Sequence, residues 1–276
     1  MLKLGQYNVL RVVKVVDFGV YLDGEERGEI LLPNEYVPRD CNPDDDIKVF
    51  IYFDSEDRII ATTETPVIAV GEFAAMKVVA VTDVGAFLDW GLRKDLLVPF
   101  REQKVRMVEG CTYIVYAYVD EDSDRIVATE KVHKFLDNSP AEYEAWQEVN
   151  LLIMRKTDIG YSVIINNAHT GLIYTNEIFQ PLHIGQKLIG YMKEVREDGK
   201  IDVALQKPGY DIVEGITKQI MTALADNGGI LDISDKSDAE KIYTLFACSK
   251  KNYKKAVGLL YKQGLIGVEA EEIYLR

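Results

Sequence analysis

Three stretches of this sequence repeat one pattern and decide the fold: VVKVVDFGVYL (residues 12–22), VVAVTDVGAFL (78–88) and MRKTDIGYSVII (154–165). Each places Asp, an apolar residue and Gly just before a run rich in β-branched and aromatic side chains. Each is followed by an aliphatic run, EILLPNE (29–35), DLLVPFRE (95–102) or GLIYTNE (171–177), and later by a polar turn. A pattern that recurs along a chain indicates tandem copies of one structural unit.

Within each copy the sequence predicts β-structure. Val, Ile, Tyr and Phe recur over short runs, and clusters of Gly, Asp, Asn and Ser separate those runs. Five short strands in about 60 residues are typical of a small barrel. We expect the repeated Gly to let a long strand bend as the barrel forms. The predicted barrels span residues 1–66, 67–134 and 148–208.

Residues 135–147 form the predicted linker between the second and third barrels. The segment KFLDNSPAEYEAWQE (134–148) interrupts the β-pattern. Ser139 followed by Pro140 is typical of the start of a helix, because Pro is tolerated at the first helical position. We therefore expect a short helix in this linker.

After residue 209 the apolar period becomes that of helices. The residues that recur at this spacing are Ile212, Ile216, Ile220 and Leu224. Asn227-Gly228-Gly229 is predicted to end this first helix.

Two further helices and a hairpin are predicted to complete the domain at residues 209–276. Ser237 is expected to cap a helix over about 238–247, and Ser249 to cap KKNYKKAVGLLYKQ, which Gly264 ends. The tail LIGVEAEEIYLR is expected to form a two-stranded hairpin. Three helices followed by a hairpin describe a winged helix.

Charge is distributed unevenly along the chain. The 276 residues carry 45 acidic and 32 basic side chains, a net charge of -13. Residues 1–146 hold 28 acidic and 16 basic side chains, residues 147–208 hold 7 and 7, and residues 209–276 hold 10 and 9. A polyanionic partner is therefore expected to bind the second half.

The composition predicts a cytoplasmic protein with no membrane segment. No stretch approaches the ~20 apolar residues that a membrane helix needs. The start, MLKLGQYNVLRVVK, lacks the pattern of a signal peptide. Cys41, Cys111 and Cys248 are odd in number and widely spaced, which indicates neither a disulfide framework nor a zinc site.

The phrases DFGVYL, DVGAFL and DIGYSV, together with GLIYTNE, resemble the S-one type RNA-binding repeat, an OB-fold barrel. The order of three such repeats before a winged helix, and the stretch SKKNYKKAVGLLYKQGLI (249–266), are similar to the conserved virulence factor B family of bacteria. This resemblance implies a mainly β fold of three tandem five-stranded OB-fold barrels, followed by a C-terminal α+β winged-helix module. It also implies RNA binding, post-transcriptional control of gene expression and no catalytic activity.

In the repeat family, two aromatics beside the Gly and a His on the next strand face the nucleic acid. Copy one has Phe18 and Tyr21, and copy two has Phe87 alone. The third copy has Ile159 and Ser162 in place of the aromatics. At the position of the His, the three copies are aligned with Leu32, Val98 and Tyr174.

We expect the third barrel to bind single-stranded RNA, because aromatic faces stack bases and cations track the backbone. Tyr161 and Tyr174 are its candidate stacking residues. Its candidate phosphate-binding residues are Arg155, Lys156, Lys193, Arg196 and Lys200. The alternative interpretation is that the tyrosines are packing residues and the cations are ordinary surface charges.

The third helix of the winged-helix domain gives the sharpest local prediction. At 100° per residue, Tyr253, Ala256, Val257 and Leu260 fall on one arc. The cations predicted to bind RNA from the other side are Lys251, Lys254, Lys255 and Lys262. Lysines without arginine favour phosphate attraction over base readout. A solvated lysine face is the alternative.

In the first two barrels, Phe18, Tyr21 and Phe87 are weaker candidates for RNA binding. They lie among acidic runs such as Asp44-Asp45-Asp46, and a local negative field repels phosphate. These two barrels are instead expected to set geometry or to contact another protein.

The sequence predicts no catalytic residues, no metal site, no cofactor and no small-molecule substrate. His133, His169 and His183 have no partners at metal-ligand or triad spacing. The run Asp120-Glu121-Asp122-Ser123-Asp124 resembles the start of a calcium loop, but Arg125 and Lys131 occupy the positions of the required Gly and Glu.

These observations favour a non-enzymatic single-stranded RNA-binding regulator that uses the third barrel and the winged helix. Two alternatives stay open. One is a protein–protein adaptor on ribosomal or transcription machinery with degenerate barrels. The other is a DNA-binding regulator that uses the winged helix.

Overall fold

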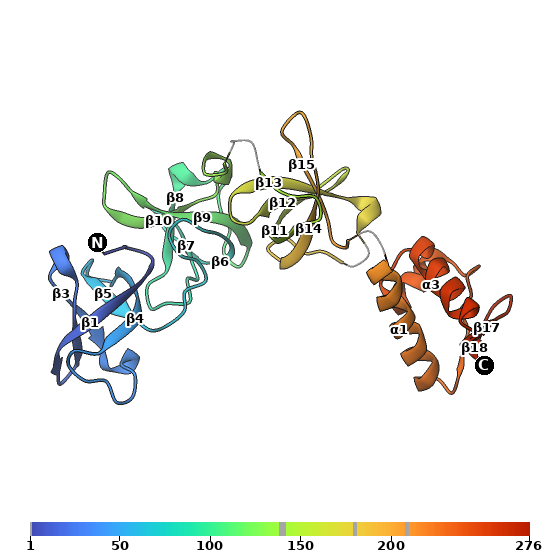
Figure 1. Ribbon diagram of the computed structural model, residues 1–276. Helices are drawn as coiled ribbons and strands as arrows, with labels where there is room; N and C mark the ends of the chain where they lie inside the picture. The colour runs from blue at the N-terminus through green and yellow to red at the C-terminus, as the bar shows by residue number, and fades with distance from the viewer. Residues whose placement is uncertain (1, 138–141, 179–180, 208–209) are drawn as a thin grey trace. The chain divides into compact units, whose positions relative to one another are not determined.

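The computed structural model describes residues 2–137, 142–178, 181–207 and 210–276. It divides into two compact units, residues 1–137 and 138–276. The described part contains three five-stranded β-units and a C-terminal domain of three helices and three short strands (Figure 1). The predicted fold class is therefore confirmed. The predicted domain boundaries stay predictions.

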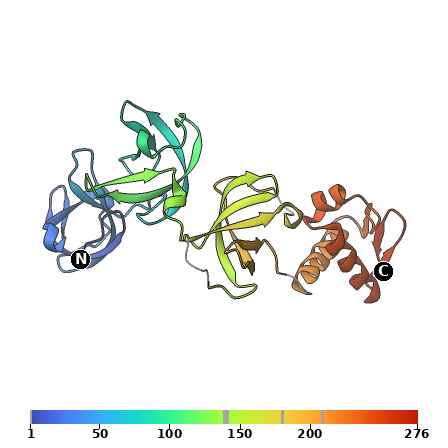
Figure 2. The same cartoon turned by 90° about the horizontal axis from the view of Figure 1, so that it is seen from above.

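The first β-unit is a closed barrel of β1 (Tyr7–Val16), β2 (Gly19–Asp23), β3 (Glu29–Pro33), β4 (Asp46–Phe53) and β5 (Ile59–Thr62). Its strand order is β1-β2-β3-β5-β4, and Figure 2 shows it in blue as a ring. Antiparallel pairs form four of its contacts, and the parallel pair β3–β5 closes it. The inward side chains, such as Val12, Leu22 and Leu32, are fully buried.

The second β-unit has the same connections but is an open sheet. Its strands are β6 (Phe73–Val81), β7 (Gly85–Leu88), β8 (Leu96–Pro99), β9 (Thr112–Asp120) and β10 (Arg125–Thr129), in the order β10-β9-β6-β7-β8. β8 and β10 lie side by side without a hydrogen-bonded ladder between them. This unit, the second barrel below, is thus a barrel left open between β8 and β10.

Two aromatic side chains of the first barrel are buried in the core cluster of the second. Phe50 and Tyr52 of β4 belong to the same buried cluster as Trp90, which follows β7. The rings of Phe50 and Trp90 meet edge-on with centroids 5.8 Å apart. The indole Nε1–H of Trp90 donates to the carbonyl oxygen of Ile68 at 2.7 Å, so this buried polar group is satisfied.

The third β-unit is again a closed barrel. Its strands are β11 (Glu148–Thr157), β12 (Gly160–Ile165), β13 (His169–Tyr174), β14 (Lys187–Val195) and β15 (Ile201–Ala204), in the order β11-β12-β13-β15-β14. Residues 142–147 just before it are irregular with one turn, so no helix forms there. The predicted cap at Ser139 and Pro140 lies outside the described residues.

The first strand of each barrel shifts its pairing with the second strand partway along. The register of β1 with β2 shifts at Val13, that of β6 with β7 at Val79, and that of β11 with β12 at Met154. A β-bulge at such a shift bends a strand and increases its twist. The repeated Gly follows each shift as the first residue of the second strand, and its expected role in bending stays a prediction.

The C-terminal domain comprises α1 (Tyr210–Asp226), β16 (Ile230–Leu231), α2 (Ala239–Phe246), α3 (Lys250–Lys262), β17 (Ile266–Val268) and β18 (Ile273–Leu275). Ile216, Ile220 and Leu224 of α1 are buried in its core, and the side chain of Ile212 lies outside the described residues. The hairpin β17–β18 forms as predicted, and β16 adds a third strand.

The cap of α2 differs from the prediction. Asp238 is the N-cap residue, without a side-chain cap bond. The Ser237 hydroxyl instead accepts a hydrogen bond from the backbone N–H of Ser234 at 2.9 Å. Ser237 therefore stabilises the turn before the helix.

Candidate nucleic-acid interface

Helix α3 is held in place by its cap and by one apolar side. The Ser249 hydroxyl accepts a hydrogen bond from the backbone N–H of Asn252 at 3.2 Å, as predicted for an N-cap. The four residues of the predicted apolar arc, Tyr253, Ala256, Val257 and Leu260, are all buried. The helix packs with this side against α1 and α2, which fixes the opposite side toward solvent.

That opposite side carries the lysine stripe, which we define as Lys251, Lys254, Lys255 and Lys262. All four residues are exposed, and none forms an ion pair with an acidic residue in the described part of the chain. Lys251 lies in the first turn, where the helix dipole disfavours a cation, and Lys262 lies in the last turn, where the dipole favours one. The stripe creates a concentrated positive surface.

The third barrel places three of its five predicted cations in ion pairs. Lys193 pairs with Glu177, Arg196 with Asp202 at 2.9 Å, and Lys200 with Asp198 at 2.8 Å. The hydrogen bond to Glu177 raises the pKa of Lys193, and that to Asp202 raises the pKa of Arg196. All three cations are therefore already partly neutralised by acidic neighbours.

Arg155 and Lys156 are the remaining cations of this barrel. Both are exposed on β11, and within the described ranges neither has an acidic partner. Arg155 pairs with Ser162 in the sheet register and Lys156 pairs with Tyr161. These two residues therefore give the barrel exposed positive charge that no acidic side chain of the described residues pairs with.

The two candidate tyrosines of the third barrel have different surroundings. Tyr174 is half-buried, its hydroxyl accepts a hydrogen bond from Arg196, and the guanidinium lies 5.7 Å from its ring centre. Tyr161 lies on the core side of β12 and packs against the barrel core. The structure thus favours packing for Tyr161 and leaves Tyr174 beside a cation.

The sheet register corrects one alignment made from the sequence. Tyr174 lies opposite Gly160, and the residues opposite the equivalent glycines are Pro33 and Pro99. Leu32 and Val98, which were aligned with the His of the repeat family, are fully buried in their cores. Neither of the first two barrels therefore offers a polar ring at this position.

In the first barrel, the exposed Phe18 and the half-buried Tyr21 form an aromatic pair. Their centroids are 6.2 Å apart at 84°, and Phe18 is 57% exposed. Lys14 lies over the Tyr21 ring at 4.6 Å and also pairs with Glu29. The pair has the form of a stacking surface, but its cation is neutralised.

In the second barrel, Phe87 is half-buried and lines a cavity of about 340 Å³. Lys94 and Arg125 also line this cavity, and both contact Asp57 of the first barrel. We did not identify this cluster from the sequence. Its acidic member comes from a turn of another repeat, and no local pattern signals that contact.

The described residues also bear on the predictions about metal sites, membrane segments and cysteines. No three His, Cys, Asp or Glu side chains in that part of the chain are grouped to hold a metal ion. None of its helices is long and apolar enough to cross a membrane. Cys41, Cys111 and Cys248 are free thiols.

Two known domain families match parts of the chain. The S1 domain family matches residues 4–64 and 70–131, which contain the first two barrels. The CvfB-like winged helix domain matches residues 218–275. No catalytic domain is among these matches.

Relatives align with nearly the whole chain. The "Uncharacterized protein YitL" of Bacillus subtilis is 29% identical over 95% of this chain and 90% of its own length. The "Conserved virulence factor B" of Staphylococcus saprophyticus is 23% identical over 99% and 94%. A solved Streptococcus pneumoniae structure, described as a multidomain protein with nucleic acid binding domains, is 24% identical over 99% and 98%, with a TM-score of 0.44.

Proposed function

Since this chain belongs to the conserved virulence factor B family, whose architecture of S1 domains and a winged helix it shares, we propose that it is a non-enzymatic single-stranded RNA-binding protein. Its role is the post-transcriptional control of gene expression in the bacterial cytoplasm, where its three free thiols stay reduced. The lysine stripe of α3 and the third barrel are the RNA-binding surfaces.

The lysine stripe is the observation that carries this proposal. Four exposed lysines without acidic partners among the described residues stand out in a chain of net charge -13. Exposed lysines gathered on one side of a helix are suited to binding phosphates, which they would neutralise. Lysine is a point charge, so this surface would hold the backbone and give weak sequence preference.

The third barrel would add base stacking to this backbone contact. Tyr174 offers a ring face beside Arg196, and Arg155 and Lys156 supply free charge on β11. Lys193, Arg196 and Lys200 would contribute where a phosphate displaces or bridges their carboxylate partners. Stacking is worth ~1–3 kcal/mol per base, so one ring refines binding that the cations provide.

The test is a fluorescence anisotropy titration of the full chain with a labelled single-stranded RNA of about 12 nucleotides. Lys251→Glu with Lys255→Glu is expected to weaken binding about tenfold or more, because two phosphate contacts become repulsive. The matched control is Lys77→Glu with Lys104→Glu, which changes the same charge at two exposed lysines of the second barrel. Equal effects of the two pairs would contradict the proposal.

Competition experiments at the same salt concentration separate the remaining interpretations. Unlabelled single-stranded RNA is expected to compete better than duplex DNA of equal length. Preference for duplex DNA would make the winged helix a DNA-binding module instead. Absence of binding to every nucleic acid would favour the adaptor.

A further inference from the structure

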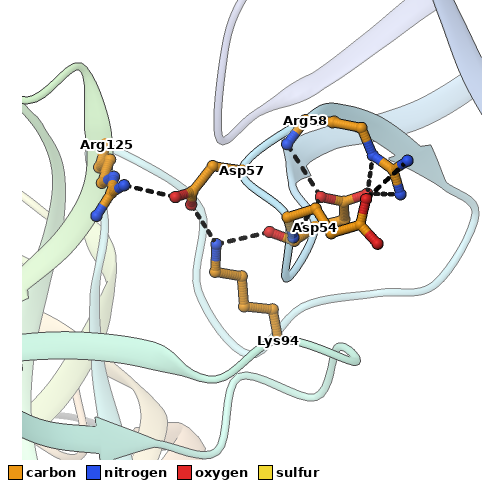
Figure 3. Close-up of polar contacts among 6 residues, drawn as sticks. Asp54, Asp57, Arg58, Lys94 and Arg125 are labelled. Carbon is orange, nitrogen blue, oxygen red and sulfur yellow. Dashed lines mark hydrogen bonds and ion pairs between the residues drawn. The ribbon is translucent and has the colours of Figure 1, made fainter.

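The turn between β4 and β5 is built to present one carboxylate. The Asp54 carboxylate accepts hydrogen bonds from the backbone N–H groups of Glu56 and Arg58, both at 2.9 Å, and from the Arg58 Nε at 2.9 Å. Asp57 stands at the tip with a φ of 60°, a left-handed conformation that few residues other than Gly adopt. The turn therefore has a fixed shape, shown in Figure 3.

Asp57 holds two cations of the second barrel. Its Oδ1 lies 2.9 Å from the Lys94 Nζ, and its Oδ2 contacts the Arg125 Nη2 (Figure 3). Lys94 also donates to the carbonyl oxygen of Asp54 at 2.7 Å. The hydrogen bond from Lys94 and the two positive charges lower the pKa of the Asp57 carboxyl, so it is ionised at neutral pH.

These ion pairs contribute little to holding the two barrels together. Their side chains are between 33% and 59% exposed, and ion pairs this accessible to water add little stability. The barrels already share the buried cluster of Phe50, Tyr52 and Trp90. The position of Asp57 therefore suggests a different role.

The cations that Asp57 holds border the cavity at Phe87. Phe53, Phe87 and Trp90 are among its aromatic lining residues, and Lys94 and Arg125 supply its positive charge. A volume of about 340 Å³ lies within the range of small-ligand sites. A ring beside two cations is the combination that binds a base together with its phosphate.

We propose that Asp57 acts as a built-in competitor that blocks a single-stranded RNA site on the second barrel. Its carboxylate occupies the position of an RNA phosphate between Lys94 and Arg125, next to a base-stacking face on Phe87. The inference rests on the proposed RNA-binding function. The charged side chains that line the cavity are two cations, Lys94 and Arg125, and two acids, Asp57 and Asp95. Without the charge of Asp57, two positive charges would remain beside one negative charge.

The test is Asp57→Asn in the full chain, with the same labelled RNA. This variant keeps the shape of the side chain and removes its charge, so the RNA affinity should rise about tenfold, as charge-assisted contacts become available to phosphate. The slope of log affinity against log salt should steepen by about 1. Asp122→Asn is the matched control, since Asp122 is exposed and has no ion pair among the described residues.

Two further variants separate competition from loosening of the barrels. Arg125→Ala also removes an ion pair to Asp57, but it removes the phosphate-binding cation as well, so it should not raise the affinity. When Arg125→Ala is added to Asp57→Asn, the expected gain in RNA affinity should be lost. Equal gains from Asp57→Asn and Asp122→Asn, or a gain that persists without Arg125, would overturn the proposal.

Trp90 provides a signal from the cavity itself. The chain has two tryptophans, so Trp146→Phe leaves Trp90 as the single reporter. RNA should change the Trp90 emission in the Asp57→Asn variant and much less in the parent. Binding that depends on the lysine stripe while Asp57→Asn changes nothing would sink this inference alone, and absence of RNA binding in every variant would remove the proposed function too.

Discussion

The three repeated glycines are required by the close approach of a neighbouring strand. A Cβ atom at Gly19, Gly85 or Gly160 would lie 2.3, 2.4 or 1.9 Å from a backbone carbonyl oxygen of the adjacent strand. The sequence showed that a glycine recurs at the same position of each repeat. It could not show the reason, because the carbonyl belongs to a strand that pairs only after folding.

Gly160→Ala is therefore expected to destabilise the third barrel. The added methyl group must push β12 away from the Ile173 carbonyl, and overpacking of this kind costs about 1–3 kcal/mol. Urea unfolding followed by far-UV circular dichroism measures this cost. An unchanged midpoint would show that the strand pair relaxes without strain.

Cys248 is a buried thiol with an unusual ionisation. Burial raises its pKa to about 11, whereas an unfolded thiol ionises near pH 8.5. The folded protein keeps the proton that the unfolded chain loses, so the stability from this group is full below about pH 8.5 and is lost as the pH rises to 11.

Cys248 should consequently resist a thiol reagent in the folded protein. In a Cys41→Ser, Cys111→Ser variant at pH 8, a disulfide-exchange reagent is expected to label Cys248 only as fast as the domain opens. The parent should show an additional fast phase from the exposed Cys111. Rapid labelling of Cys248 in the double variant would contradict its burial.

At the scale of elements, the bounds of the three C-terminal helices were predictable to within a residue or two. The helix expected in the linker before the third barrel was not found in residues 142–147. The apolar arc and the lysine stripe of α3 follow directly from helical periodicity. The two-residue strand β16 has too few residues to form a pattern. The ion pairs of Lys193 and Arg196 were also beyond prediction, because Glu177 and Asp202 come from other segments of the barrel.

Unlike the repeated glycines, Gly258 has room for a side chain. It lies in the interior of α3, has an ordinary helical φ, and a Cβ there would meet nothing within 4 Å. Gly258→Ala should stabilise the winged helix by about 0.5–1 kcal/mol, because alanine has the higher helix propensity. Thermal unfolding with and without the substitution measures this, and a lower midpoint would contradict the expectation.

One comparison can rank the aromatic pair of the first barrel and the lysine stripe of α3 by their contribution to RNA binding. Phe18→Ala with Tyr21→Ala removes the aromatic pair of the first barrel, and Lys251→Glu with Lys255→Glu reverses charge on α3. The lysine pair should weaken RNA binding more, because the rings lie in an acidic region. Titration of both variants at one salt concentration gives the ranking, and the reverse order would refute the charge-based assignment.

At the scale of the molecule, the first unit is the more acidic of the two, and Asp57 pairs with two of its cations. The four lysines of the stripe should give a log–log salt slope near -3 for single-stranded RNA. Hydrogen exchange should show RNA protection in α3 and in β11–β15, and much less in β1–β10, where Asp57 holds Lys94 and Arg125. Protection confined to β1–β10 would reverse this assignment.

The shared cluster of Phe50, Tyr52 and Trp90 has a consequence for how the first two barrels melt. Each barrel taken alone would leave part of this aromatic surface in water. The two repeats should therefore lose their structure together, as a single calorimetric transition with an enthalpy suited to both. A substitution that destabilises one repeat should then lower the unfolding temperature of the other as well.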